Sequence, residues 1–146
     1  MMNFILALLL PLPSFALSFE VIGPCSEKPI FETKTTLKNA SLGHISTYLF
    51  KKNKIPFTGD ETGIGSIANS PTGDAALEVL SETALRAYGW CVEIDGQQPE
   101  VMPDKFIIDE QTKNIRWFYA FALYESGEWT QLCSPSHLVK PKSICN

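Results

Sequence analysis

Two histidines are the side chains in this sequence best suited to proton transfer near neutral pH, because an unperturbed imidazole titrates in that range. His44 follows a glycine, and His137 ends the proline-containing segment 134–137. Ser136 directly precedes His137 in the chain, whereas a nucleophile has to face its base across a site. The sequence contains no Gly-x-Ser-x-Gly elbow. We therefore predict no catalytic constellation and no enzyme activity.

Four cysteines could hold a metal ion or form disulfides: Cys25, Cys91, Cys133 and Cys145. They show no Cys-x-x-Cys spacing, and the histidines show no His-x-x-x-His spacing, so a metal site is not predicted. Four cysteines allow three disulfide pairings, between which the sequence alone does not decide. We prefer Cys91–Cys133, which would join two strands of an aromatic-rich region, and Cys25–Cys145, which would tie the ends of the domain together.

The start of the chain predicts the oxidising compartment that disulfides need. Residues 4–12 form an apolar run about half as long as the roughly 20 residues that cross a bilayer. Three small residues then fit the small-x-small pattern of signal-peptide cleavage, although no Lys or Arg precedes the run: Ser14, Ala16 and Ser18. We predict that residues 1–18 are a signal peptide and that residues 19–146 are one domain, exported to the periplasm or secreted. A buried N-terminal strand and an uncleaved anchor are the alternatives.

The composition limits the kinds of partner. The 146 residues suffice for a single domain, and 45% hydrophobic with 19% charged residues is typical of a chain that folds. The formal charge is −4, from 12 Lys and Arg against 16 Asp and Glu, so the dense basic face that nucleic acids need is missing. The rest of the sequence contains no apolar run that is long enough to span a membrane. We expect neither a nucleic-acid partner nor a stable membrane span after cleavage.

The region from Tyr88 to Cys133 gives the clearest structural signals. Residues 88–94 alternate in the pattern of a half-buried strand, which Asp95 and Gly96 end in a tight turn. Residues 115–124 are apolar or aromatic on both faces, which predicts a central strand covered on both sides. We also expect a short strand at 105–108, a turn at 125–128 and a returning strand at 129–133.

The remaining elements are predicted from composition. Aromatic and β-branched residues favour strands at 19–22 and 45–50, followed by a solvated turn at Lys51–Lys54. Four glycines and a proline make 58–74 a predicted loop, with a plain turn preferred over a short helix starting at 65–69. It lacks the Gly-Lys-Ser/Thr ending of a phosphate-binding loop. Residues 75–87 fit either a helix capped by Asp74 or two strands joined at 81–83.

Residues 89–96, Gly-Trp-Cys-Val-Glu-Ile-Asp-Gly, resemble the Gly-Trp-x-Tyr-x-Val-Asn-Gly motif of the transcobalamin C-terminal-like domain family. Ile115, Trp117 and Tyr119 match its later Ile-x-Trp-x-Tyr strand, which an acidic turn precedes. Residues 63–67 are similar to a family segment in which a short helix begins. The resemblance covers about residues 45–133, and its specific residues are Gly89, Trp90, Asp95, Gly96, Ile115, Trp117 and Tyr119. The motif Tyr is replaced by Val92, and the motif Asn by Asp95.

The resemblance implies a β-grasp-like α+β domain, in which a short helix packs on a small mixed sheet and residues 75–80 form a strand. Cobalamin carriers close this domain over the ligand together with a helical domain, which is missing from this sequence, so cobalamin binding does not follow. Stand-alone bacterial relatives are exported proteins of unknown role.

These observations favour an exported binding or interaction module whose partner is an unspecified protein or small molecule. A small extracytoplasmic hydrolase or an enzyme inhibitor is the alternative. All three tryptophans lie between Tyr88 and Trp129, where they either fill a small core or line a ligand cleft. We expect Trp90 and Trp117 to serve the fold, and binding residues to lie at strand edges and in 58–74. No cofactor is predicted, and no oligomeric state.

Overall fold

The computed structural model describes residues 15–146. In chain order the elements are β1 (Leu17–Ile22), β2 (Pro29–Thr35), β3 (Ala40–Ser41), α1 (Leu42–Lys52), β4 (Phe57–Asp60), β5 (Gly63–Ile67), β6 (Leu77–Ser81), β7 (Ala84–Ile94), β8 (Ile107–Ile108), β9 (Asn114–Glu125) and β10 (Glu128–Pro135). Single 3₁₀ turns lie at Gly73–Ala76 and Ser136–Leu138. The fold is α+β, mostly sheet with one short helix, as predicted.

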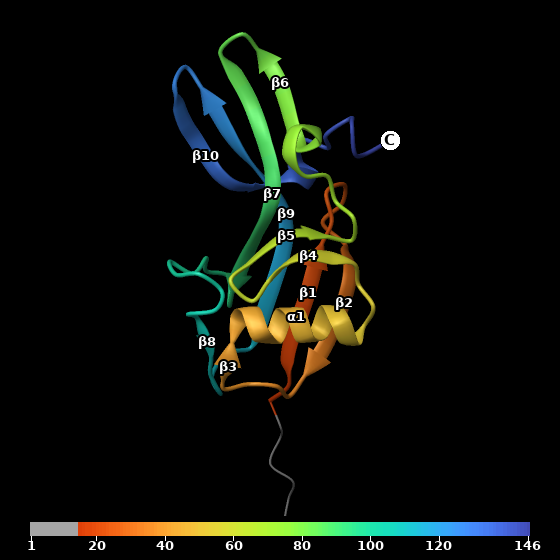
Figure 1. Ribbon diagram of the computed structural model, residues 1–146, viewed down its shortest axis with the longest axis vertical. Helices are drawn as coiled ribbons and strands as arrows, with labels where there is room; N and C mark the ends of the chain where they lie inside the picture. Colours follow the sequence, from red (N-terminus) through yellow and green to blue (C-terminus); the bar gives the residue numbers. More distant parts are fainter. Residues whose placement is uncertain (1–14) are drawn as a thin grey trace, which may run out of the picture.

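One strongly twisted mixed sheet organises the molecule, in the strand order β2-β1-β9-β7-β6. The long strand β9 lies at its centre, as the two apolar faces predict. β1 runs parallel to the first half of β9, while β10 pairs antiparallel with its second half along the same edge. Because of the twist, β10 and β2 appear on opposite sides of Figure 1. We call the part that contains β1 and β2 the helix-covered half, and the part that contains the β6–β7 and β9–β10 hairpins the hairpin half.

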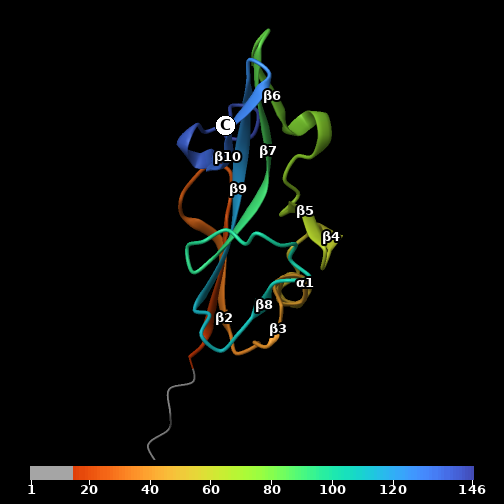
Figure 2. The same ribbon diagram turned by 90° about the vertical axis from the view of Figure 1, so that its left-hand side faces the viewer.

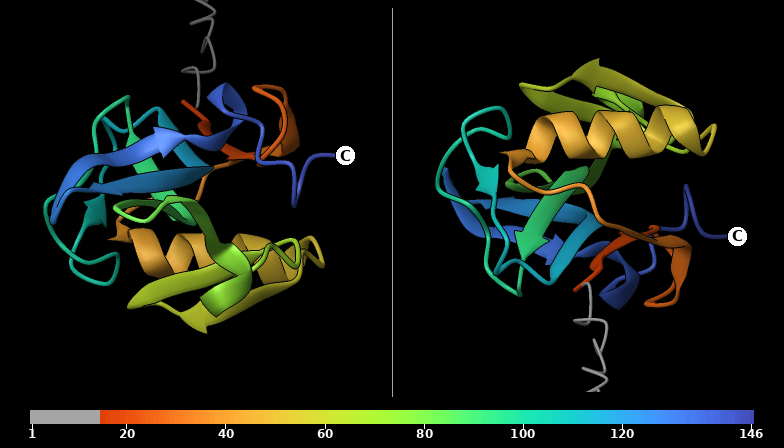
Figure 3. Two further views of the ribbon diagram at one scale, coloured as in Figure 1. Left: turned by 90° about the horizontal axis from the view of Figure 1, so that it is seen from above. Right: turned by 90° about the horizontal axis from the view of Figure 1, so that it is seen from below.

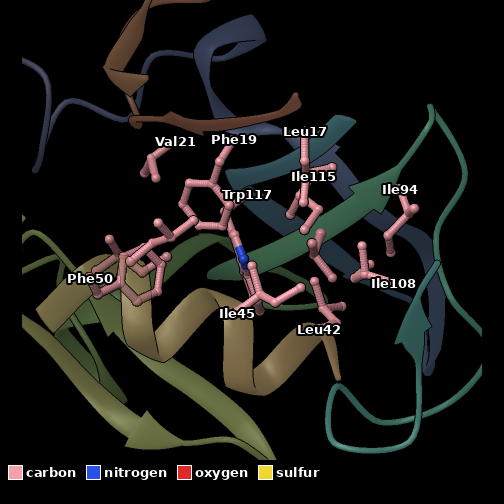
Figure 4. Close-up of a cluster of buried hydrophobic side chains, with 13 residues drawn as sticks. Leu17, Phe19, Val21, Leu42, Ile45, Phe50, Ile94, Ile108, Ile115 and Trp117 are labelled. Atoms are coloured by element: carbon pink, nitrogen blue, oxygen red, sulfur yellow. The ribbon is translucent and has the colours of Figure 1, made fainter. Parts of the chain in front are cut away.

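The helix-covered half contains the main hydrophobic core. Helix α1 lies against one face of the sheet, with the β4–β5 hairpin alongside it (Figure 3). Figure 4 shows the side chains from both layers meeting between helix and sheet. They are Leu17, Phe19, Val21, Leu42, Ile45, Leu49, Phe50, Ile67, Val92, Ile94, Ile108, Ile115 and Trp117.

The strand predicted at 45–50 is wrong, because these residues belong to α1. The hydroxyl of Ser41 caps the helix by accepting the N–H of His44 at 3.1 Å. Ile45, Leu49 and Phe50 then face the sheet at helical spacing, which overrides their strand preference. The turn predicted at Lys51–Lys54 contains instead the last residues of α1 and its cap.

The loop predicted at 58–74 is also wrong over its first part, where β4 and β5 form a hairpin. Gly59 allows the bend in β4 with a φ of 103°, a conformation that glycine adopts without steric cost. Residues 63–67 are therefore a strand, not the start of a helix. Gly43 of α1 lets this hairpin approach, because a Cβ there would lie 1.8 Å from the carbonyl oxygen of Glu61.

For residues 75–87 the sequence left a helix and two strands open. The structure has two strands, since β6 pairs antiparallel with the start of β7. The predicted strand at 88–94 is confirmed within β7, and the predicted turn follows it with φ values of 49° at Asp95 and 80° at Gly96. The turn at 125–128 and the return strand are confirmed as β9–β10. Only Ile107 and Ile108 of the predicted strand at 105–108 pair, with β3.

Two disulfides join distant parts of the chain, in the pairing preferred from the sequence. Cys25, after β1, is bonded to Cys145 in the C-terminal segment, and Cys91 of β7 is bonded to Cys133 of β10. Among residues 15–146 every cysteine is in a disulfide.

The apolar run at 4–12 lies outside the described residues, so the signal peptide stays a prediction. Leu17 and Ser18, which that prediction assigns to the leader, belong to β1. Leu17 is fully buried, and Ser18 donates its N–H to the carbonyl oxygen of Lys113 at 2.9 Å. The folded domain therefore includes these two residues.

Candidate binding groove at the edge of strand β7

The residues that carry the family resemblance lie together on two adjacent strands. Gly89 and Trp90 are on β7, opposite Ala120 and Tyr119 of β9, and Trp117 pairs with Val92. The carboxylate of Asp95 accepts the N–H groups of Lys113, at 3.1 Å, and Asn114, at 2.8 Å. This fastens the turn after β7 to the start of β9.

The two motif tryptophans have different surroundings. Trp117 is 3% exposed, and its indole N–H donates to the hydroxyl of Ser46 on α1 at 2.9 Å. Trp90 is only partly buried, and its indole N–H donates to Ser70 at 2.7 Å. Trp90 packs against both the main core and the small hairpin-half cluster of Ala76, Tyr88, Tyr119 and Phe121. Trp117 therefore serves the fold as expected, whereas Trp90 also reaches the surface.

Trp90 lies on a stretch of β7 whose edge away from β9 pairs with no strand within residues 15–146. β6 pairs with β7 only as far as Ala87, and the next contact on that edge is the bridge between Ile94 and Gln97. In Figure 2 the loop of residues 97–106 crosses the middle of the molecule below the β6–β7 hairpin. We call β7 from Tyr88 to Glu93 the free edge.

Two hollows follow the free edge and share Trp90, Cys91, Gln98 and Cys133 as lining residues. The first measures about 360 Å³, and its floor consists of small residues: Ala87, Gly89, Ala120 and Ala122. The second measures about 270 Å³ and lies between the β4–β5 hairpin, through Gly63 and Ile64, and the loop, through Pro99 to Pro103. Together they form one groove, mostly apolar, that we call the β7 groove.

The first hollow is open because its floor consists of glycine and alanine, which have no side chain or only a methyl group. A Cβ added at Gly89 or at Gly63 would meet no atom within 4 Å. Neither glycine has a positive φ, so a larger residue fits the backbone at both positions. The groove can therefore be filled by substitution without disturbing the core.

An ionic cluster in the hairpin half holds the strands beside this groove. The hydroxyl of Tyr88 donates to the Glu78 carboxylate at 2.5 Å, and Arg86 bonds to the same oxygen at 3.3 Å. Burial, followed by the hydrogen bond to Glu78, raises the pKa of Tyr88 to about 12. Burial alone raises the pKa of Tyr119 to about 12.

The histidines do not meet each other or a nucleophile in a site. His44 is on α1, where its Nδ1 lies 2.9 Å from the Glu61 carboxylate at the surface. His137 lines a separate hollow of about 180 Å³ with Glu27, Glu93 and Arg116. Among residues 15–146, no group of three or more His, Cys, Asp or Glu side chains is arranged to hold a metal ion. In the same range, no helix has the length and apolar character needed to span a membrane.

No family model matches the sequence, and no curated protein matches it significantly. Among solved structures, a Ruminococcus gnavus crystal structure described as that of a "putative metal binding protein" is similar to this chain, with 18% sequence identity and a TM-score of 0.43. The match covers 70% of this chain and 94% of the other.

Sequence reasoning pointed to strand edges and to 58–74 as places for binding residues, and Gly63 and Ile64 of that segment do line the groove. It missed Gln98 and the loop that contains it. The only available signal was the pair of prolines, Pro99 and Pro103, that keep this loop out of regular structure.

Proposed function

We propose that this protein is an exported, non-enzymatic binding module of the β-grasp type, related to the transcobalamin C-terminal-like domains, and that it takes its ligand in the β7 groove. The observation that carries the proposal is the groove itself, an apolar cleft along a strand edge with Trp90 in its wall. Apolar clefts with a few polar groups are the usual sites for ligands. Gln98 supplies such a group.

The β-grasp assignment is supported by the order of the elements. A β1–β2 hairpin is followed by α1, and β9 then returns parallel to β1 at the centre of a mixed sheet. The family relationship is supported by the placing of the motif residues side by side on β7 and β9.

The absence of enzyme activity is proposed because His44 and His137 belong to different parts of the surface, and within residues 15–146 no hydroxyl or thiol is hydrogen-bonded to either imidazole ring. The hollow beside His137 holds Glu27, Glu93 and Arg116. The structure offers no particular support for the hydrolase or the inhibitor.

Export is supported by two disulfides. Because Leu17 is fully buried in β1, we expect cleavage after Ala16 and not after Ser18. Mass spectrometry of the N-terminal peptide from the exported fraction should find Leu17 as the first residue. Retention of the intact chain inside the cell would contradict export.

The binding proposal is tested by NMR titration of the oxidised protein with a panel of small apolar molecules and short peptides. We expect shifts to concentrate at Gly89, Trp90 and Gln98. Gly89→Val should abolish them by filling the first hollow, because a side chain there meets only open space. Glu32→Val, a matched substitution at an exposed position of β2, should bind normally.

A result that leaves binding intact in Gly89→Val, or that places the shifted residues elsewhere, would overturn the groove as the site. Tryptophan fluorescence gives a second readout. A ligand response should disappear in Trp90→Phe and persist in Trp129→Phe, since Trp129 is exposed on β10.

A further inference from the structure

The backbone of the free edge indicates what class of ligand the β7 groove takes. Ile94 donates its N–H to the carbonyl oxygen of Gln97 at 2.8 Å and accepts the N–H of Gln97 at 3.0 Å. Its peptide groups therefore face this edge. Since successive strand residues direct these groups to opposite edges, those of Val92 and Trp90 face it too.

A hydrogen bond on the other side of β7 agrees with this alternation. Asp95, the residue after Ile94, donates its N–H to the carbonyl oxygen of Asn114 on β9 at 3.0 Å. On the free edge, β6 stops at Ala87 and Gln97 reaches only Ile94. Within the described residues no hydrogen bond is formed by the N–H and C=O groups of Trp90 and Val92 that face this edge. A row of unpaired strand groups is a template for another strand.

We propose that the groove binds an extended peptide segment, which adds to the free edge of β7 as a further strand in line with β6. This inference rests on the proposed function, because it concerns the same groove. The bound segment would supply the backbone partners that Trp90 and Val92 lack, which is the recognition mode of β-strand addition.

The two hollows suit the side chains of such a segment. Ala87, Gly89 and Cys91 face the disulfide side of the sheet and line the first hollow. Val92 and Trp117 face the α1 side and line the second. Side chains of an extended peptide alternate between the two faces of a sheet. Successive apolar side chains of the ligand can therefore enter one hollow and then the other.

Length and charge define the segment further. The free edge accommodates about six residues, roughly 20 Å at the rise of an extended strand. No Lys, Arg or His lines either hollow. Glu100 is exposed between the lining residues Pro99 and Val101. We therefore expect uncharged, apolar segments with a flanking Lys or Arg to bind, and acidic segments to be rejected.

The test uses a library of blocked hexapeptides with varied aliphatic residues and a Lys at either end, added to the oxidised protein. The best binder is then resynthesised with a single N-methyl group at each position in turn. Strand addition predicts that methylation at alternate residues weakens binding about tenfold, the value of one lost hydrogen bond. Methylation of the intervening residues should change the Kd by less than about threefold.

Hydrogen exchange provides a readout on the protein. Binding should slow exchange of the Trp90 and Val92 amides and leave Cys91 and Glu93 unchanged, because the alternation along β7 directs their N–H groups towards β9. Gly89→Val should lose both peptide binding and this protection, while Glu32→Val should keep them.

The outcomes separate this inference from the proposed function. If small apolar molecules bind in a Gly89-dependent way but no peptide does, or if methylation weakens binding equally at every position, strand addition is overturned and the groove remains a site. If nothing binds, both proposals fail. Dimerisation that protects the same two amides without peptide would assign the edge to a second copy and also overturn the inference.

Discussion

The two halves of the sheet achieve stability in different ways. In the helix-covered half, side chains from β1, β7, β9 and α1 form one continuous core. In the hairpin half the buried clusters are small, and large apolar side chains remain exposed: Leu77, Val79, Leu80, Trp129 and Leu132. Val79 is 76% exposed and Leu132 71%.

Disulfides replace core packing in the hairpin half. Cys91–Cys133 fixes β10 to β7, and Cys25–Cys145 holds the C-terminal segment, whose Val139 and Ile144 pack on the hairpin-half cluster. An exposed apolar surface on a small domain often marks an interaction site. The comparison suggests that one half supplies the fold, and that its boundary with the other, where the β7 groove lies, supplies the binding surface.

The largest effects are expected from the disulfides that hold the hairpin half. Cys25 and Cys145 are separated by 120 residues, so replacing both by Ala should lower the free energy of unfolding by about 5 kcal/mol in the chain-entropy model. Cys91 and Cys133 are separated by 42 residues, which gives about 4 kcal/mol. Denaturant titration measures both losses. Unchanged stability in both double variants would show that the hairpin half is held by packing instead.

The two tryptophans compare the core with the groove directly. Trp117→Ala should cost roughly 3–5 kcal/mol, because the side chain is only 3% exposed and packs in the main core. Trp90→Ala should cost about half as much, since one side of Trp90 faces the groove. Urea unfolding of the two variants checks the ranking. Equal losses would mean that Trp90 is as enclosed as Trp117 and that the groove is closed in solution.

Two glycines give a matched pair with smaller effects. Gly43→Ala should destabilise the protein by about 1–3 kcal/mol, because the added methyl group collides with the backbone of the β4–β5 hairpin. Gly89→Ala should be neutral or slightly stabilising, because open space lies above β7. Thermal unfolding distinguishes them. A loss at Gly89 as large as that at Gly43 would contradict an open first hollow.

The smallest effect is expected at alkaline pH, because the hydroxyl groups of Tyr88 and Tyr119 are only partly buried. Both pKa values rise from 10 to about 12 on folding, so well below pH 10 both groups are protonated in either state and their contribution to stability does not change with pH. Between pH 10 and 12 the unfolded chain ionises first, and the free energy of unfolding falls. The double variant with Phe at both positions should show a smaller fall, measured by denaturant titration at each pH. An identical pH profile would show that these tyrosines are not buried together.

Local signals predicted the elements of the sheet centre. Alternation of buried and exposed residue types predicted β7, and the two apolar faces of residues 115–124 predicted the central position of β9. Asp95 and Gly96 predicted the turn after β7. α1 was missed because the β-branched and aromatic residues of 45–50 were weighed above the capping Ser41 and the helical spacing of Ile45 and Leu49. The β4–β5 hairpin was missed because glycines mark both loops and bent strands.

The groove could not be predicted from local signals. It depends on where β6 stops pairing with β7 and on how the loop of residues 97–106 passes the same edge, and both are set by tertiary packing. Trp90 and Trp117 also look equivalent in the sequence, since both lie in alternating strands. Only the three-dimensional arrangement shows that Trp117 is almost fully buried, whereas Trp90 is partly exposed and lines both hollows.

The most direct test of the free edge is amide hydrogen exchange along β7 in the protein without ligand. We predict that Trp90 and Val92 exchange much faster than Cys91 and Glu93. The alternation that follows from the bonds of Ile94 and Asp95 directs only the latter two amides towards β9. Equal, slow exchange at all four residues would show that the edge is already paired, and would contradict a groove open to an incoming strand.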